Sequence, residues 1–226
     1  MNKPTTQIVN WNRSAVEAAV DLLADGWNRE GPLDLGDLLV LTQTKGAGRR
    51  LRFALARHAD EAGQGMLPPR FATPSFLFTP PKAKAVASEV ACLLLWEQVF
   101  KEIEWTEYDS LFPKPPEGKD KGDGWTRAVA KSLHGLRRTL SEADWDCGKV
   151  ATAESLSLEE PDRWADLAQL EQRYREQLAA TGLDDPFDAK REAAGSPVLA
   201  DGMRKVVVLG VSGFPGLAQI ALERLV

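Results

Sequence analysis

Apolar runs and amphipathic stripes alternate near both ends of the chain. Residues 38–41, Leu-Leu-Val-Leu, form an unbroken apolar run that predicts a buried strand. A loop is expected over residues 42–46, followed by a helix over residues 47–59, where apolar positions recur three and four residues apart. Near the other end, residues 205–211 predict a strand continuous enough to be buried on both faces, and a helix is expected over residues 217–225.

A proline-rich segment lies between these two ends. Residues 67–74 contain too many prolines for a central strand, but they suit a short edge strand that continues into residues 75–78. A long helix is then predicted from about Lys82 to Ile103, packed on a sheet. Its inward positions would be Val86, Val90, Leu93, Leu94 and Val99, and its outward positions Glu89, Glu97 and Lys101.

The middle of the chain is predicted to be helical. Residues 112–124 are rich in proline, glycine and charge and predict a loop. Two apolar stripes of helical spacing follow, at Trp125, Val129, Leu133, Leu136 and Leu140, and at Trp164, Leu167, Leu170, Tyr174 and Leu178. Pro161-Asp162 is suited to begin the second helix. We therefore expect an α/β core of residues 1–103 and 203–226 with an inserted helical subdomain of residues 104–202.

The alternation of strands and helices predicts a parallel sheet flanked by helices. Only three strands are convincing, and a three-stranded sheet buried on both faces is small for an independent domain. The core is therefore expected to be incomplete, and the chain to be the front part of a longer protein.

Composition narrows the class of protein. The 226 residues carry 28 basic and 33 acidic side chains, a net charge of −5. No apolar run approaches the roughly 20 residues of a membrane-spanning helix, and the start lacks the apolar segment of a signal peptide. A cytoplasmic protein without a membrane partner is expected. Cys92 and Cys147 lie in helical surroundings and are expected to be reduced and structural.

Charge is distributed unevenly along the chain. Residues 44–57 hold Lys45 and four arginines but no carboxylate, whereas residues 141–188 hold thirteen acidic and four basic side chains. The simplest interpretation of such a basic run is a solvated helix face. The alternative interpretation of this basic run is a surface that binds an anion.

A glycine-containing loop after the first strand of an α/β sheet is a usual place for nucleotide phosphates. Residues 42–50 do not fit the phosphate-loop pattern, because Lys45 precedes both glycines and no Lys-Ser or Lys-Thr pair follows. The metal-holding acid expected at the end of a later strand is also missing from residues 209–214. These two losses argue against ATP binding, and we predict no catalytic residue, cofactor or metal for this chain.

Three segments carry a family resemblance. They are LGDLLVLTQTKGAGRRLRFALARHADEAGQGMLPPRFATPSFLF at residues 35–78, VVVLGVSGFPGLAQIALERL at residues 206–225, and the helical stretch of residues 164–194. In order and spacing they resemble the AddB/RexB-type subunit of bacterial helicase-nucleases, whose first domain is an inactivated superfamily 1 helicase domain. The chain departs from the family at Leu209-Gly210-Val211, where many relatives have Asp-Gly-Phe, and at Gln43-Thr44-Lys45, where many have Pro-Thr-Arg.

The resemblance implies a P-loop-NTPase-like, helicase 1A-like core with an inserted helical subdomain, without enzyme activity of its own. It implies a role in double-strand-break repair and recombination, with single-stranded DNA and an AddA/RexA-type helicase subunit as partners. A single strand of DNA that crosses the carboxyl ends of the sheet would meet side chains that can read bases, bind phosphates or stack on bases. The candidates are Gln43, Thr44, Lys45, Arg49, Arg50, Arg70, Thr73, Phe76 and Phe214.

Several alternatives stay open. Phe76 and Phe214 can be ordinary core residues. Asp188-Ala189-Lys190 matches the Asp-x-Lys of metal-dependent nucleases, but Asp185-Pro186 is suited to cap and begin a helix, whereas that motif needs a strand. Two other functions compete with DNA binding: a small α/β enzyme that binds a nucleotide or phosphosugar at Gly46-Ala47-Gly48, and a scaffold that only docks a partner subunit.

Overall fold

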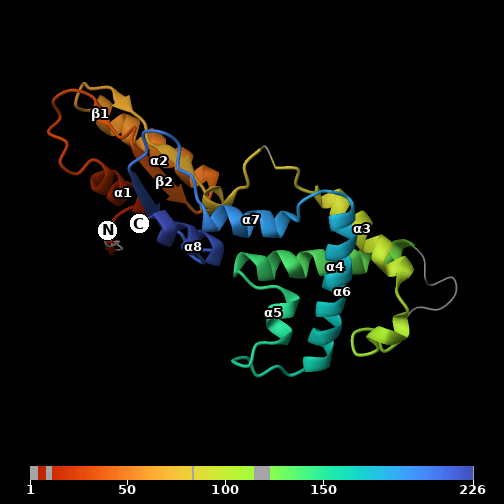
Figure 1. Ribbon diagram of the computed structural model, residues 1–226. Coiled ribbons are helices and arrows are strands. Elements are labelled where there is room, and N and C mark those ends of the chain that lie inside the picture. Colours follow the sequence, from red (N-terminus) through yellow and green to blue (C-terminus); the bar gives the residue numbers. More distant parts are fainter. Residues whose placement is uncertain (1–4, 9–11, 83, 115–122, 226) are drawn as a thin grey trace. The chain divides into compact units, whose positions relative to one another are not determined.

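The computed structural model describes residues 5–8, 12–82, 84–114 and 123–225. The chain has a mixed α/β architecture with small parallel sheets and a helical region (Figure 1). It divides into two compact units, Met1–Thr79 with Ser196–Val226, called here the sheet unit, and Pro80–Gly195, called the helical unit.

The sheet unit is built on a three-stranded parallel sheet of order β4-β2-β5. In chain order its elements are α1 (Ala15–Leu23), β1 (Leu33–Asp34), β2 (Leu38–Thr42), α2 (Lys45–Asp60), β3 (Met66–Leu67), β4 (Arg70–Ala72), the 3-10 helix η1 (Pro74–Phe78), β5 (Lys205–Leu209) and α8 (Gly216–Leu225). Strands β1 and β3 form a separate parallel pair. The predicted strands at residues 38–41, 67–74 and 205–211 are thus present, with the proline-rich one at an edge as expected.

The central strand β2 explains why this unit holds together. Every residue of β2 is buried, and helices α1 and α2 supply Val20, Leu51 and Leu55 to the core cluster that includes this strand. A capping box at Ser14 and Glu17 begins α1. The apolar stripe predicted for residues 47–59 is therefore confirmed as the buried face of α2.

Two predictions for this unit are wrong. Strand β5 is not buried on both faces: it is an edge strand of mixed exposure, and Val208 is 39% exposed. A run of valines predicts a strand, but its burial depends on neighbours that lie elsewhere in the sequence. Residues 75–78 do not extend the edge strand, because Pro74 begins the 3-10 helix η1 there.

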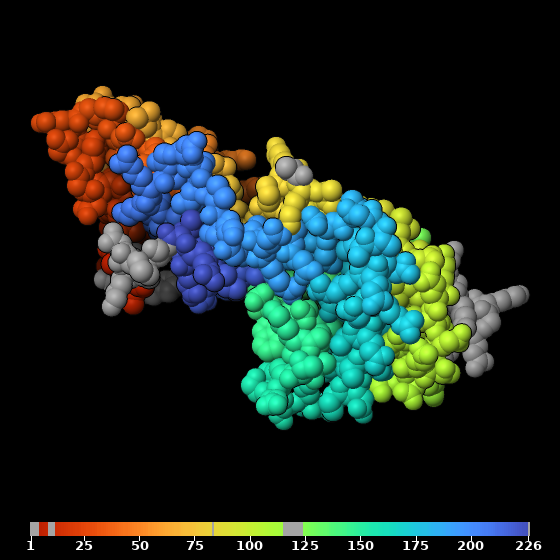
Figure 2. All heavy atoms as spheres, in the orientation of Figure 1, coloured from red at the N-terminus to blue at the C-terminus, as the bar shows by residue number. Residues whose placement is uncertain are grey.

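The helical unit consists of α3 (Glu89–Glu102), the 3-10 helix η2 (Trp105–Tyr108), α4 (Asp123–Glu142), α5 (Cys147–Ala151), α6 (Pro161–Ala180) and α7 (Pro186–Gly195). Both predicted stripes contribute to its core, and Pro161 stands in the first turn of α6 as expected. Trp96 stacks on Tyr174 at a ring-centroid distance of 4.5 Å, which joins α3 to α6. In Figure 2 the atoms of α5 and α6 form one continuous surface, in agreement with their close packing.

The long helix predicted from Lys82 to Ile103 is shorter than expected and has a different environment. It begins at Glu89, because the hydroxyl of Ser88 caps it by accepting from the backbone N–H of Ala91. It packs on α4 and α6 and not on a sheet, so that Val90 and Leu94 are exposed while Cys92, Trp96, Val99 and Phe100 are buried.

The packing of α3 decides to which compact unit it belongs. The first division between the units lies between Thr79 and Pro80, so α3 is part of the helical unit, whereas the sequence analysis grouped residues 1–103 with the α/β core. The second division lies between Gly195 and Ser196. Most of the predicted loop at residues 112–124 lies outside the described residues, but Phe112 packs edge-on against Trp105.

Two expectations about the whole chain are met in its described part. Cys92 and Cys147 are both buried and unbridged, as predicted. None of the helices over the described ranges has the length and apolar character needed to cross a bilayer.

Candidate nucleic-acid interface

The carboxyl ends of three parallel strands bring several of the predicted residues to one edge of the sheet unit. Thr42 at the end of β2 pairs with Leu209 at the end of β5, and Leu41 pairs with Ala72 at the end of β4. The segments that follow these strands therefore begin side by side. They contain Gln43 and Thr44 after β2, Thr73 after β4, and residues 210–214 after β5.

The connection from β2 to α2 is shorter than predicted. Only Gln43 and Thr44 lie between the strand and the helix, because α2 already begins at Lys45. Thr44 is the helix cap, and its hydroxyl accepts from the backbone N–H of Ala47 at 3.1 Å. The predicted loop over residues 42–46 is therefore wrong, and Gly46 and Gly48 both lie inside a helix.

Gly48 has a packing role that the sequence did not reveal. A β-carbon placed on it would lie 3.2 Å from the β-carbon of Phe71 and 3.2 Å from the hydroxyl oxygen of Thr42. The absence of a side chain thus lets α2 approach β2 and β4 closely. The two glycines do not form the flexible phosphate loop required by the nucleotide-binding alternative.

The exposed face of α2 is strongly basic. Lys45, Arg49, Arg50, Arg52 and Arg57 are all exposed. Among the residues that the structure describes, only Arg57 of these five has a carboxylate partner, Glu61, and their closest N···O distance is 3.6 Å. The first turn of α2 contains no acidic residue, so Lys45 sits uncompensated at the positive end of the helix dipole. An external anion would relieve that repulsion.

Phe53 is a prominent member of this surface that the sequence analysis missed. Its side chain is 70% exposed, in the middle of α2. Arg49 and Arg50 precede it by one helical turn and Arg57 follows it by one turn, so they are its neighbours on the helix surface. The available signal was its position, because Phe53 lies off the apolar stripe formed by Leu51 and Leu55.

Arg52 of α2 and Arg70 of β4 stack on aromatic rings near the edge strand β4. The guanidinium carbon of Arg52 lies 5.4 Å from the ring centroid of Phe71, and that of Arg70 lies 4.6 Å from the ring centroid of Phe76. Arg70 stands at the first residue of β4, two residues before the carboxyl end, and is exposed. Arg70 and Phe76 are thus brought together as a pair, and one face of the Phe76 ring is covered.

Phe76 and Phe214 occupy intermediate positions. Both rings are half-buried, so neither is an ordinary core residue and neither is fully free to stack on a base. The buried members of η1 are Pro74, Leu77 and Phe78. Thr73 is also partly committed, because its hydroxyl lies 3.0 Å from that of Ser75.

The residues at the phosphate and metal positions do not suit ATP. Lys45 lies at the first position of α2, and no Lys-Ser or Lys-Thr pair follows it. At the end of β5, where a metal-holding acid would be expected, Leu209 is packed against the core cluster of the sheet unit. Over the described residues, no group of three or more His, Cys, Asp or Glu side chains is arranged to hold a metal.

No protein-family model matches the chain, and no curated protein is significantly similar to it.

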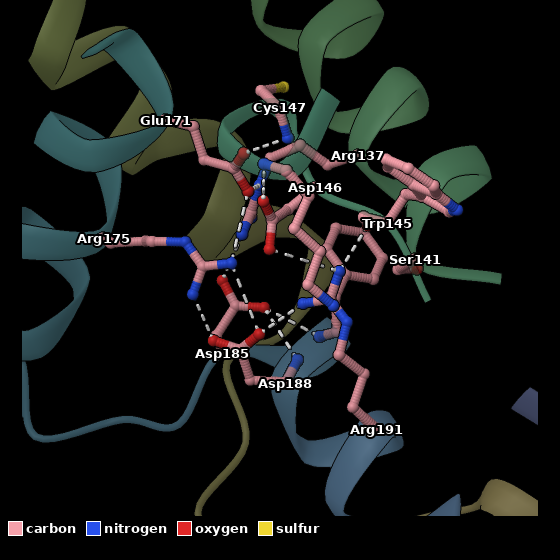
Figure 3. Close-up of polar contacts among 12 residues, drawn as sticks. Arg137, Ser141, Trp145, Asp146, Cys147, Glu171, Arg175, Asp185, Asp188 and Arg191 are labelled. Atoms are coloured by element: carbon pink, nitrogen blue, oxygen red, sulfur yellow. Dashed lines mark hydrogen bonds and ion pairs between the residues drawn. The ribbon is translucent and has the colours of Figure 1, made fainter. Parts of the chain in front are cut away.

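A second cluster of charged side chains lies in the helical unit and was also missed. Figure 3 shows Arg137 of α4 with Glu171 of α6 and Asp185, which precedes α7. Arg137 donates to Glu171 at 2.7 Å and to Asp185 at 2.9 Å, and all three side chains are almost completely buried. The guanidinium also lies against the rings of Tyr174 and Phe187.

Most polar atoms of this cluster are used by contacts within the chain, although the buried Nη1 of Arg137 has no hydrogen-bond partner among the described residues. Glu171 also accepts from the backbone N–H of Cys147, and Asp185 accepts from that of Phe187, which caps α7. Burial alone would raise the pKa of Glu171, but Arg137 and the other donors outweigh it and hold that pKa below its usual value. Burial raises the pKa of the Cys147 thiol, so it is a poor nucleophile. The arrangement is that of a structural ion network.

The Asp188-Ala189-Lys190 segment, which matches the nuclease motif in sequence, lies beside this network. Asp188 and Lys190 are on α7, so the helical placement predicted from Asp185-Pro186 is confirmed. Asp188 forms ion pairs with Arg175 and Arg191. His134 is buried, and burial lowers its pKa, followed by a contribution from Arg138. His58 lies in the other unit, with its ring 5.8 Å from that of Trp27.

Proposed function

We propose that the sheet unit is a non-catalytic domain that binds single-stranded DNA through the basic face of α2 and the adjoining carboxyl edge of the sheet. The observation that carries this proposal is the group of exposed cations Lys45, Arg49, Arg50 and Arg52, which have no carboxylate partner in the described part of the chain. Phosphate neutralisation by such residues supplies most of the affinity of non-specific nucleic-acid binding.

The finer form of the proposal is a P-loop-NTPase-like, helicase 1A-like fold from a bacterial repair helicase-nuclease of the AddB/RexB type. Three parallel strands followed by helices support it, as do the three resembling segments of residues 35–78, 164–194 and 206–225. In that setting the chain would work with an AddA/RexA-type helicase subunit. The absence of suitable triphosphate and metal ligands at Lys45 and Leu209 is consistent with an inactivated domain.

Gln43 and Thr44 would face the bases at the sheet edge, while Arg49 and Arg50 would contact phosphates. The hydroxyl of Thr44 accepts the capping bond and can still donate its own hydrogen. The small-molecule alternative is weaker, because the glycines that it needs lie inside α2.

Fluorescence anisotropy with a labelled oligo-dT tests the proposal. The chain is expected to bind at low salt, with an affinity that falls as salt rises. The double variant Arg49→Ala, Arg50→Ala should reduce the slope of log K against log salt by about 1.4, because each phosphate of a single strand that is no longer neutralised lowers the slope by about 0.7.

The matched control is Arg138→Ala with Arg163→Ala. These arginines are also exposed helical residues and cause the same change in net charge, but each has a carboxylate partner. The control should bind like the unchanged protein. The proposal fails if the chain does not bind oligo-dT at low salt, or if both double variants bind equally well. A pure scaffold would bind its partner subunit and show no DNA binding.

A further inference from the structure

We propose that the ring of Phe53 is a stacking platform for a base of a single strand, so that α2 binds nucleotides by a base as well as by phosphates. This inference rests on the proposed function and deepens it. It assigns to the basic face of α2 a preference for unpaired bases over duplex.

The exposure of Phe53 is the first observation. At 70% exposure, the ring leaves most of its apolar area in contact with water in the middle of a regular helix. The core of the sheet unit already has its own residues from this helix, Leu51, Leu55 and Ala59. Phe53 therefore adds little to the packing of this core.

The charges around the ring are the second observation. Arg49 and Arg50 lie one turn before Phe53, and Arg57 lies one turn after it. A single strand of DNA running along the basic face of α2 would place phosphates near the guanidinium groups and a base over the Phe53 ring. The helix rises about 18 Å from Lys45 to Arg57, at about 1.5 Å per residue, which leaves room for a few nucleotides.

A stacked base is the ligand that fits this combination. Every base has a π-face, and aromatic stacking beside a positive backbone-tracking surface is how proteins hold single strands without reading sequence. In a duplex the bases are stacked and paired inside the helix, so they cannot lie on Phe53 without being extruded.

A basic helix with an exposed aromatic ring can also suit an anionic membrane surface. The buried face of α2 argues against that occupant. Leu51 and Leu55 are held in the core, so Phe53 would be the main apolar group of this helix facing the lipid. An acidic peptide would pair with the arginines but would gain little from the ring.

The test compares Phe53→Leu and Phe53→Trp on three probes: oligo-dT, an abasic strand of the same length, and a duplex. Phe53→Leu keeps an apolar side chain and removes the ring. It should bind oligo-dT about 5-fold to about 150-fold more weakly, the range found when a stacking ring is removed. Binding to the abasic strand and the salt slope should not change. Phe53→Trp should retain binding to oligo-dT and quench a 2-aminopurine placed in the strand.

The outcomes separate this inference from the proposed function. If the unchanged protein does not bind oligo-dT, both fail. If it binds and Phe53→Leu binds equally well, the phosphate-binding function stands and the stacking role is overturned. An equal loss on the abasic strand would also overturn it, because the ring would then act through the fold of α2, and thermal melting of Phe53→Leu checks that fold directly. Phe53-dependent binding to phosphatidylserine vesicles or to poly-glutamate, with DNA binding unaffected, would assign the site to one of those ligands instead.

Discussion

Arginines serve opposite purposes in the two units of this protein. In the helical unit, all seven arginines form ion pairs with carboxylates; they are Arg127, Arg137, Arg138, Arg163, Arg173, Arg175 and Arg191. On α2 of the sheet unit, Arg49, Arg50 and Arg52 have no such partner over the described residues. A paired guanidinium is largely neutralised within the protein, whereas an unpaired one remains available to an external anion.

Burial adds to this difference. The Arg137 network is removed from water, so each of its charges depends on the others. The cations of α2 are solvated and repel one another, and no acid in the first turn compensates them. Changes in the first region should therefore alter stability, and changes in the second should alter binding.

The largest expected effect is on stability, from Arg137→Met. This substitution leaves Asp185 buried without a cation and leaves Glu171 with only Arg175, at 3.3 Å, and breaking a buried pair from one side costs about 3–5 kcal/mol. Urea denaturation followed by far-UV circular dichroism measures it. The adjacent Arg138→Met is the control, because that exposed pair contributes about 0–1 kcal/mol. Equal losses from the two variants would mean that the buried network is not an important source of stability.

Acidification should weaken the same network and the ion pairs of Asp188 beside it. Burial alone would raise the pKa values of Glu171 and Asp188, but the neighbouring arginines hold both below their usual values. Folding therefore gains stability from these carboxylates above their unfolded pKa of about 4, and loses it as the pH falls through the lower folded values. For buried Glu171, a folded-state pKa one below the unfolded value corresponds to about 1.4 kcal/mol of folding stability.

Thermal melting between pH 6 and pH 2 measures this loss. The variant Glu171→Gln should be less stable at pH 6 and show a shallower decline below pH 4. A decline as steep as that of the unchanged protein would assign the acid sensitivity to other carboxylates. Buried His134 also has a lowered pKa, so it adds a separate loss as the pH falls below about 6.5.

The two regions also differ in how much the sequence could predict. The stripes of α4 and α6, and the buried strand β2, follow from periodicity because each is a property of one short segment. The burial of Arg137 does not, although it lies four residues after Leu133 and thus near an apolar stripe. A charged residue in that position is interpretable only once Glu171 and Asp185 are known to meet it.

Predictions that depended on neighbouring elements were wrong more often. The sheet expected beneath residues 82–103 is replaced by α4 and α6, and β5 lies at an edge. At the candidate interface, the sequence supplied the cations and the sheet edge. It did not supply Phe53, because a single aromatic residue in a basic run is interpretable only when its exposure is known.

A smaller effect is expected from the two glycines of α2. Their variants test whether ligand binding by this helix depends on its basic side chains or on the backbone at its start. Gly48→Ala should destabilise the sheet unit by up to about 2 kcal/mol. Crowding of the new methyl against Phe71 and Thr42 costs about 1–3 kcal/mol, and the better helix propensity of alanine returns about 1 kcal/mol. Gly46→Ala is the control, since its methyl would meet only the Thr44 hydroxyl at 3.7 Å.

Urea denaturation gives the stabilities of both glycine variants, and oligo-dT anisotropy gives their affinities. If oligo-dT binds to the guanidinium groups of α2, Gly46→Ala should keep the affinity of the unchanged protein for oligo-dT. A loss of phosphate or nucleotide binding in that variant, with stability intact, would instead favour a site formed by the backbone at the start of α2.

The smallest expected change in stability comes from giving α2 the kind of pairing found in the helical unit. Phe53→Glu places a carboxylate one turn from Arg49, Arg50 and Arg57, and its pairing with Arg57 has the favourable orientation, with the acid four residues before the base. Each such pair is worth about 0.2–0.5 kcal/mol in a helix, so thermal melting should show a slight stabilisation. Affinity for oligo-dT should nevertheless fall by more than in Phe53→Leu, because Phe53→Glu removes the ring and also neutralises neighbouring cations. If Phe53→Glu binds as tightly as Phe53→Leu, the arginines around position 53 do not contact phosphate, and the contrast between paired and unpaired arginines would not locate the proposed DNA-binding site.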